Sequence, residues 1–170
     1  EKRSGTLEAL LTAPVTDLQV VLAKYLGALA FFIILCAPTA LYFVFLGVRG
    51  LDLGLLASAY VGLLLLGGLY LAVGCLISSL CTNQVVAALL CFVLLAAMSF
   101  MPFLVVNSTL ENELLKKAVG YVNFFPMGPH SGLGDFNRGL VTLAHLAYPL
   151  TGIALCLFLT CRILESRSWK

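Results

Sequence analysis

The sequence predicts an all-α membrane protein, a polytopic bundle with four transmembrane helices. Of its 170 residues, 61% are hydrophobic and only 11% are charged, a composition far from that of soluble domains. Residues 25–48, 53–110 and 139–161 contain no Asp, Glu, Lys or Arg. Because a charged side chain at the bilayer centre costs about 2.5 to 3.5 kcal/mol, uncharged apolar stretches of this length indicate membrane spans.

The uncharged stretches predict four spans, at about residues 18–46, 55–80, 85–106 and 140–160. The middle stretch is too long for one crossing, and its polar residues 81–84 suit a turn at a membrane face. The second span contains two small-xxx-small pairs, which allow other helices to approach closely. These pairs are Ser58 with Gly62 and Gly74 with Ser78.

Residues 1–15 predict a short helix that precedes the first span. Leu7, Leu10 and Leu11 stand at i, i+3 and i+4, so this helix has one apolar stripe. Pro14 ends it, because proline has no N–H for the helical ladder. The stripe suits a groove in a partner or the surface of the lipid, and its spacing does not choose between them.

The first long helix is expected to begin at Asp17. Thr16 and Gln19 have the spacing of a capping box, and Asp17 places negative charge in the first turn, where the helix dipole favours it. Lys24 is expected to project into the aqueous interface. Pro38 lies inside this helix, so a kink is predicted there.

Residues 107–139 predict an external segment between the third and fourth spans. It begins as an amphipathic helix and continues through Phe, Pro and Gly residues that suit an interfacial or re-entrant course. Near its end, Asp135 and Arg138 are predicted to form a local ion pair or to line a substrate exit, and the local pair requires fewer assumptions. Residues 161–170 are expected to form a polar tail.

Four crossings place both ends of this sequence on one side of the membrane. Six Lys and Arg residues lie on that side and four on the other. Because cytoplasmic segments carry the excess of basic residues, both ends are predicted to be cytoplasmic.

The residue content argues against several function classes. A net charge of +2 without a basic stripe argues against a nucleic-acid partner. The six cysteines form no CxxC pair and are interpreted as packing residues, and neither His130 nor His145 has an acid at catalytic spacing. The sequence also has no P-loop. We therefore expect no catalytic site, no metal and no cofactor, and ATP hydrolysis would need another chain.

Residues 1–15, EKRSGTLEALLTAPV, carry the most specific pattern in the chain. With GTLE at 5–8 followed by leucines and Pro14, this segment resembles the signature of the ABC-2 type transporter permeases, especially the gliding-motility and nitrous-oxide-reductase-maturation permeases. The resemblance continues at Lys24 and Gly27, at 74–79, at 135–139 and at 164–169, so it spans nearly the whole chain.

The resemblance implies that two membrane helices precede this fragment, which would give the intact subunit six. It also implies that residues 1–15 are a cytoplasmic coupling helix that docks in a groove of a separate ABC ATPase subunit. The expected coupling residues are Gly5, Thr6, Leu7, Glu8, Leu10, Leu11 and Pro14. Two permease subunits would pair with two ATPase subunits in the bacterial inner membrane, in contact with membrane lipid, to form an exporter.

Other function classes stay open. A non-transporting structural membrane subunit is the main alternative. A secondary transporter usually carries charged groups within its spans and internal repeats, and the uncharged stretches here lack such groups. An intramembrane enzyme would need a nucleophile with a base, or a metal cluster, and neither is visible. The sequence does not define the substrate, because no polar cluster outlines a pocket.

Overall fold

The computed structural model describes residues 16–47, 52–107, 114, 135–136, 138–141 and 143–168. Within these residues the chain forms four long helices, in agreement with the predicted all-α class. They are α2 (Asp17–Gly47), α3 (Leu53–Leu80), α4 (Gln84–Asn107) and α7 (Leu143–Ser168). The predicted coupling helix at 1–15 and most of the predicted external segment lie outside the described residues.

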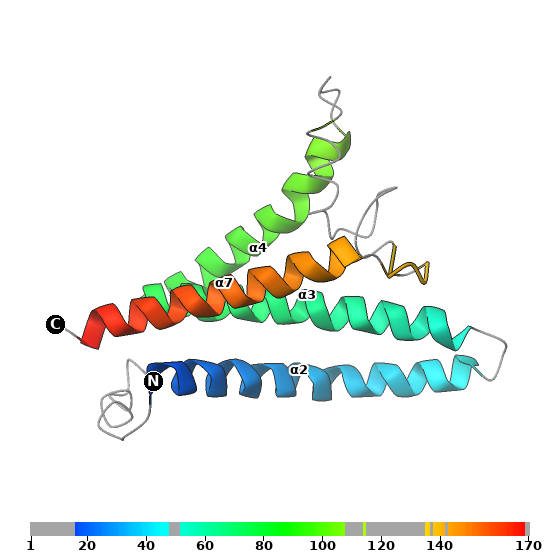
Figure 1. Cartoon of the computed structure of the whole chain (residues 1–170), viewed down its shortest axis with the longest axis horizontal. Coiled ribbons are helices and arrows are strands. Elements are labelled where there is room, and N and C mark those ends of the chain that lie inside the picture. The colour runs from blue at the N-terminus through cyan, green and yellow to red at the C-terminus, as the bar shows by residue number, and fades with distance from the viewer. Residues whose placement is uncertain are drawn as a thin grey trace.

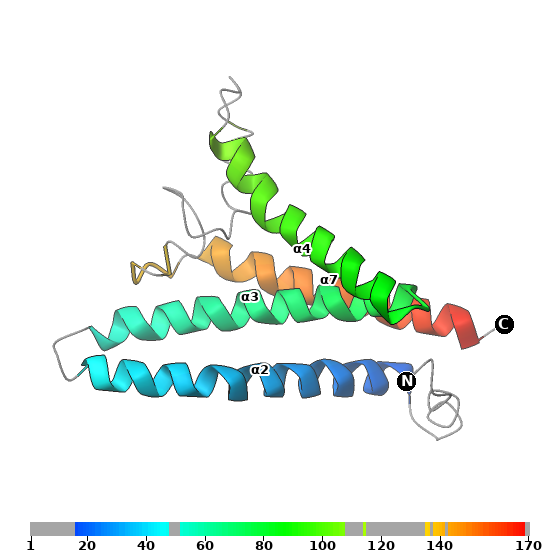
Figure 2. The same ribbon diagram turned by 180° about the vertical axis from the view of Figure 1, so that it is seen from behind.

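α3 is the central helix of the bundle. It contacts α2, α4 and α7, and α7 also contacts α2. α2 and α3 lie side by side in opposite directions, and α7 follows the direction of α3 (Figure 1). α4 leaves α3 at a clear angle, which the reverse view also shows (Figure 2). We call the end at which α2 and α4 begin and α3 and α7 end the basal end, and the opposite end the distal end.

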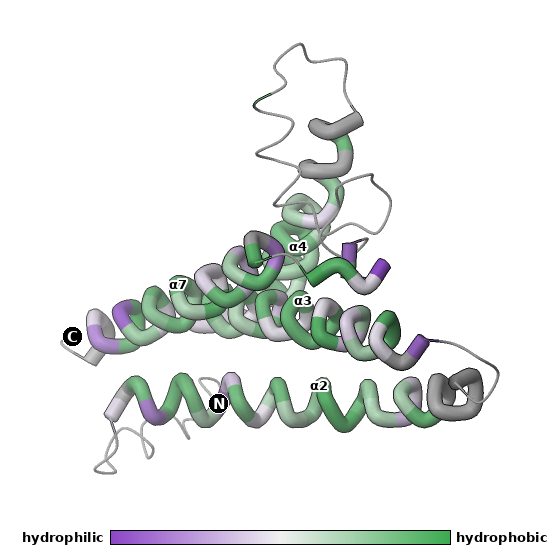
Figure 3. Tube along the Cα trace, turned by 45° about the vertical axis from the view of Figure 1, so that its right-hand side comes forward, coloured by the Kyte–Doolittle hydropathy of each residue, from purple (hydrophilic) through white to green (hydrophobic). Residues whose placement is uncertain are grey.

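Within the described residues, three helices are long and apolar enough to cross a membrane. Their candidate spans are Leu18–Leu41, Gly54–Leu80 and His145–Ser166. α4 contains a shorter apolar stretch, Gln84–Phe100, so the predicted fourth crossing is not established by length and hydropathy. Hydrophobic residues dominate the long helices, and hydrophilic residues gather towards their ends (Figure 3). The chain is therefore a multi-pass membrane protein.

Polar side chains cap the helices at the basal end. The Thr16 N–H donates a hydrogen bond to Oε1 of Gln19 over 3.1 Å, which is the reciprocal half of the predicted capping box, and α2 begins at Asp17 as expected. In the predicted turn at 81–84, Oδ1 of Asn83 accepts a 3.1 Å hydrogen bond from the Val85 N–H. This contact satisfies a backbone donor that the first turn of α4 would otherwise leave without a partner.

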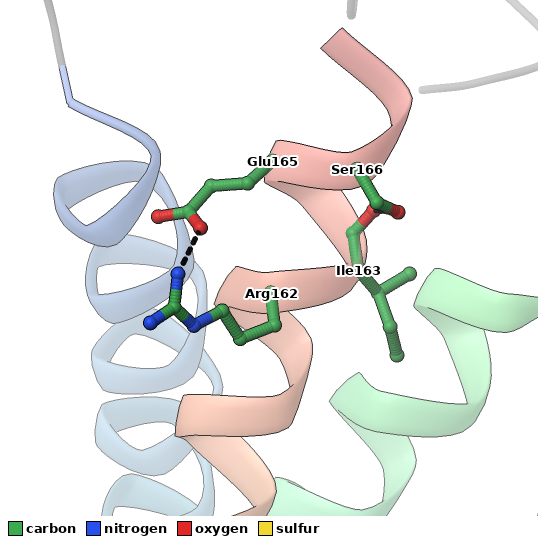
Figure 4. Close-up of polar contacts among 4 residues, drawn as sticks. All are labelled: Arg162, Ile163, Glu165 and Ser166. Carbon is green, nitrogen blue, oxygen red and sulfur yellow. Dashed lines mark hydrogen bonds and ion pairs between the residues drawn. The ribbon is translucent and has the colours of Figure 1, made fainter. Parts of the chain in front are cut away.

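α7 differs from the predicted last span at both ends. It begins at Leu143 rather than near 140, and it continues to Ser168 although the last span was predicted to end at 160. An ion pair of 2.9 Å between Arg162 and Glu165 bridges one turn of this polar extension (Figure 4). The loss of hydropathy after 160 therefore marks the end of the apolar part and not the end of the helix, because charged side chains at i and i+3 also support helical structure.

Pro38 and Pro149 lie inside α2 and α7, and both helices continue past them. Beside Pro38, Oγ1 of Thr39 donates to the Cys36 carbonyl over 2.6 Å and accepts a 2.8 Å hydrogen bond from the Tyr60 hydroxyl of α3. The bond from Tyr60 joins the region of Pro38 to α3, while the bond to Cys36 lies within α2. The kink itself stays a prediction.

Glycines on α3 and α7, which carry no side chain, let neighbouring helices approach closely. The Phe32 ring of α2 lies where a Cβ on Gly67 would stand. On the other side, a Cβ on Gly152 of α7 would lie 2.6 Å from Cδ1 of Leu69, a residue only 3% exposed. Such close approach maximises dispersion contacts, which replace the hydrophobic effect as the main force between helices in lipid.

The Gly152 contact predicts a stability effect. Gly152→Ala should lower the midpoint of thermal unfolding in mild detergent, because the added methyl group overlaps the buried Leu69 and overpacking costs about 1 to 3 kcal/mol. Gly27→Ala is the matched control, since a Cβ there meets nothing within 4 Å. Equal midpoints for the two variants would show that the α3–α7 contact is looser than described.

Candidate functional site

A cavity of about 1120 Å³ lies at the basal end, between all four helices. We call it the Lys24 cavity. α2 contributes residues from Val20 to Phe32, and α3 contributes residues from Gly67 to Ser79. The remaining walls come from the turn at 81–84, from Cys91 and Leu95 of α4, and from Thr160 and Leu164 of α7. Among the described residues that line the cavity, Lys24 is the only one with a formal charge.

Lys24 is an exposed residue near the start of α2, and it lies inside the candidate span that length and composition define. Its expected place at the aqueous interface stays a prediction. The candidate span of α2 begins at Leu18, so Lys24 is about 9 Å further along the helix at about 1.5 Å per residue. A lysine at this depth near a helix end extends its ammonium group towards water, and an ionisable residue within a span indicates a functional site by default. The cavity gives this side chain a polar wall, because Ser78, Thr82 and Gln84 line the same space.

The described lining of the Lys24 cavity offers groups that can bind a ligand. These groups are thiols, hydroxyls, amides and one ammonium group. Across the described part of the chain, no group of three His, Cys, Asp or Glu side chains is arranged to hold a metal ion. The expectation that the chain itself is not an enzyme stays a prediction.

A second group of residues anchors the chain before α7, and we call residues 135–136 and 138–140 the Phe136 anchor. The Leu140 N–H donates to the Asp135 carbonyl and the Gly139 N–H to the Phe136 carbonyl, over 2.9 and 3.1 Å. These are the two bonds of a Schellman motif, whose left-handed position is Gly139 with φ of 78°. The anchor is therefore a defined stop after a helical turn.

Phe136 fixes this anchor to α3. Its side chain is fully buried, and a Cβ on Gly62 would lie 2.9 Å from the ring. The Ser58 hydroxyl donates to the Phe136 carbonyl over 2.7 Å. The small pair Ser58 and Gly62 was predicted to let another helix approach. In the structure these two residues contact Phe136, in the segment that leads into α7.

The side chains of Asp135 and Arg138 lie in different surroundings. The Arg138 N–H donates to the Asp135 carbonyl over 3.0 Å, while the Asp135 carboxylate points to His145, with 3.5 Å between its Oδ2 and Nδ1 of the imidazole. His145 is buried, and Arg138 is exposed. Asp135 therefore links the anchor to α7, and the predicted ion pair between Asp135 and Arg138 stays a prediction. A role of either residue in a substrate exit stays a prediction.

The predicted coupling residues, from Gly5 to Pro14, lie outside the described residues, so the structure does not place them. The sequence analysis placed Lys24 at the aqueous interface and included Phe136 in the family resemblance, but it assigned neither residue to a site. The signal for Lys24 was a lone cation inside a span that starts on the same side of the membrane as the turn at 81–84. The signal for Phe136 was a large aromatic residue shortly before Gly139, which ends the helical turn.

The close contact between Gly62 and the Phe136 ring predicts that a larger side chain at position 62 opens the Phe136 anchor locally. Gly62→Ala should speed amide hydrogen exchange at Gly139 and Leu140 roughly tenfold or more, because the methyl group displaces the buried Phe136 ring. Gly54→Ala, on the same helix with nothing within 4 Å of the added atom, should leave the exchange rates unchanged. Protection that survives in Gly62→Ala would contradict the seating of Phe136.

Comparison with known proteins identifies the family. The profile of the family described as ABC-2 family transporter protein matches residues 1–161, which include the predicted coupling segment, the Lys24 cavity residues up to Thr160 and the Phe136 anchor. No curated protein and no solved structure matches the chain. The broad resemblance seen in the sequence is thus confirmed, while the narrower likeness to gliding-motility and nitrous-oxide-reductase-maturation permeases receives no support. The chain belongs to the ABC-2 family of transporter proteins.

Proposed function

We propose that this chain is the membrane-spanning permease region of an ABC transporter, and that a separate ATPase subunit hydrolyses the ATP that drives transport. The observation that carries this proposal is the family match over residues 1–161 of a multi-pass helical protein. Members of this family generally work with an ATPase subunit.

The proposal includes α4 as a fourth crossing. α4 has 24 residues, which extend about 36 Å at about 1.5 Å per residue and exceed a hydrocarbon core of about 30 Å. Its start at the basal end, after the polar turn at 81–84, suits a membrane face. With four crossings, six of ten basic residues fall on the basal side, which is then cytoplasmic.

We assign coupling to residues 1–15, where Leu7, Leu10 and Leu11 would contact the groove of the ATPase. This segment directly precedes α2, whose first turns are held by the other helices. The buried Tyr25 donates to the Gly68 carbonyl of α3 over 3.3 Å, and a Cβ on Gly68 would lie 3.4 Å from Ile153 of α7. Because packed helices move as bodies, a displacement at the start of α2 is passed on to α3 and α7.

The finer parts of the proposal follow from the family resemblance. Two permease subunits pair with two ATPase subunits in the bacterial inner membrane, and transport runs outward, as in the permeases for gliding motility or nitrous-oxide-reductase maturation. The exposed apolar faces of α2 and α4 leave room for a second subunit and for lipid. A structural subunit without transport is the alternative, and it requires no ATPase. A secondary transporter would likewise need none.

The test is co-purification of the full-length permease with its ATPase. Leu7→Asp should weaken the complex at least about tenfold and abolish coupled ATPase activity, because an unpaired carboxylate would be buried in the apolar groove. Leu114→Asp is the matched control: Leu114 is 84% exposed and lies in the predicted external segment, so the complex should persist. A Leu7→Asp complex of normal stability and activity would contradict the coupling assignment.

A further inference from the structure

We propose that the Lys24 cavity is a lipid-binding site, which takes one acyl chain from the leaflet at the basal end and holds the lipid head group at the turn 81–84. This site goes beyond the proposed transporter function and does not depend on it. The inference rests on the depth of the cavity, on its closed inner end and on the change of its lining from polar to apolar. The charge of Lys24, which is an exposed residue, plays no part in it.

The depth of the cavity matches one leaflet of a bilayer. The lining extends from Val20 to Phe32 on α2, from Gly67 to Ser79 on α3, and from Gln84 to Leu95 on α4. At about 1.5 Å per residue, each of these stretches is about 17 to 18 Å long. Because the hydrocarbon core of a bilayer is about 30 Å thick, one leaflet contributes about 15 Å. The cavity therefore begins near a membrane face and ends near the middle of the membrane.

Two contacts close the inner end of the cavity. The Phe32 ring of α2 packs on Gly67 of α3, where it occupies the place of a Cβ. The Tyr70 side chain of α3 also lines the cavity, and its hydroxyl shares a hydrogen bond with the Ser99 hydroxyl of α4. Within the described structure, the cavity is therefore a pocket that ends inside the membrane.

The side of the cavity between α2 and α4 faces the surrounding lipid. Among the described helices, α2 and α4 each pack on α3 but not closely on each other. We call the deepest apolar residues of the cavity the inner lining, and all of them are only half-buried. They are Phe32, Leu71 and Leu95. An acyl chain from the basal leaflet therefore has access to an apolar surface that the helices themselves leave partly uncovered.

The lining changes from polar to apolar from the basal end inward. At the basal end, Ser78, Thr82 and Gln84 are exposed, and their hydroxyl and amide groups line the cavity. Such groups donate hydrogen bonds to the phosphate and ester oxygens of a lipid head group. Deeper in the bundle, the inner lining removes an acyl chain from water, which is favourable in proportion to the apolar area covered. The order of the two regions is the order of head group and chain in a leaflet.

A lipid chain matches this space better than water or a compact polar solute. Water would leave the half-buried inner lining hydrated, which is unfavourable for apolar side chains. A compact polar solute would occupy only the basal end. The volume of about 1120 Å³ is slightly above that of small-molecule sites, which measure roughly 300 to 1,000 Å³, so the cavity accommodates a chain together with part of its head group.

The experiment is photolabelling of the full-length permease in mild detergent, with any ATPase that co-purifies. Two lysophosphatidylcholine probes are used, one with a diazirine at the end of its acyl chain and one with a diazirine in its head group. Mass spectrometry of peptides locates the labels. The chain probe should label the inner lining, and the head-group probe should label the turn 81–84. Chain labels confined to Leu89 and Phe92, which are exposed on α4 and do not line the cavity, would mean annular lipid only and would overturn the site.

Two matched variants locate the binding. Gly74→Leu should weaken competition by unlabelled oleoyl lysophosphatidylcholine about tenfold or more, because the new side chain takes the place of part of the acyl chain. Gly74 lines the cavity, and a Cβ there would meet only Cys91 Sγ, at 3.8 Å. Gly27→Leu is the control, since Gly27 is exposed on α2, lies outside the lining and has nothing within 4 Å of an added Cβ. Equal competition in the two variants would contradict the site.

The outcomes also separate this inference from the proposed function. If Gly74→Leu does not fold, the positions of the wild-type labels decide the matter alone. Labels in the inner lining of a permease that captures no ATPase would refute the transporter role and support the lipid site. A stable, active ATPase complex without labels in the inner lining would overturn this inference and leave the proposed function intact.

Discussion

The close approach of α2, α7 and the Phe136 anchor to α3 is the constraint on which the rest of the structure depends. Helices in lipid satisfy their backbone groups internally, so the contacts between them depend mainly on how closely their surfaces pack. Gly67 and Gly62 of α3 receive the rings of Phe32 and Phe136, and Gly152 of α7 receives Leu69. Because α3 contacts each of the other three long helices, its surface determines where they lie.

The Lys24 cavity follows from the different ways in which α2 and α4 pack on α3. α2 packs closely at Gly67 and Gly68, whereas a Cβ added at Gly74 would lie at an ordinary van der Waals distance from Cys91 of α4. The hydroxyls of Tyr70 and Ser99 then join α3 and α4 by a hydrogen bond. The helices thus enclose a space at the basal end where movements of α2 would act, and this space holds the cation and the polar turn together.

The sequence predicted the helices more fully than their contacts. Runs without charge located α2, α3 and α4 to within a few residues, because the absence of charge in lipid is a strong local requirement. The end of α7 was missed, since Arg162 and Glu165 continue a helix after hydropathy is lost. The Lys24 cavity could not be predicted, because it joins residues of four helices whose angles depend on packing. The resemblance at 1–15 located the candidate coupling residues, which the described structure does not reach.

The most direct test of this account is the side of the membrane on which each turn lies, because the fourth crossing, the cytoplasmic basal end and the position of Lys24 all depend on it. Single cysteines would replace Thr16, Asp52, Thr82 and Arg138, all of them exposed, in a variant that lacks the six native cysteines. An impermeant maleimide should label positions 52 and 138 in intact cells, and positions 16 and 82 only in inverted vesicles. Labelling of 82 and 138 from the same side would show that α4 does not cross the membrane and would contradict the account.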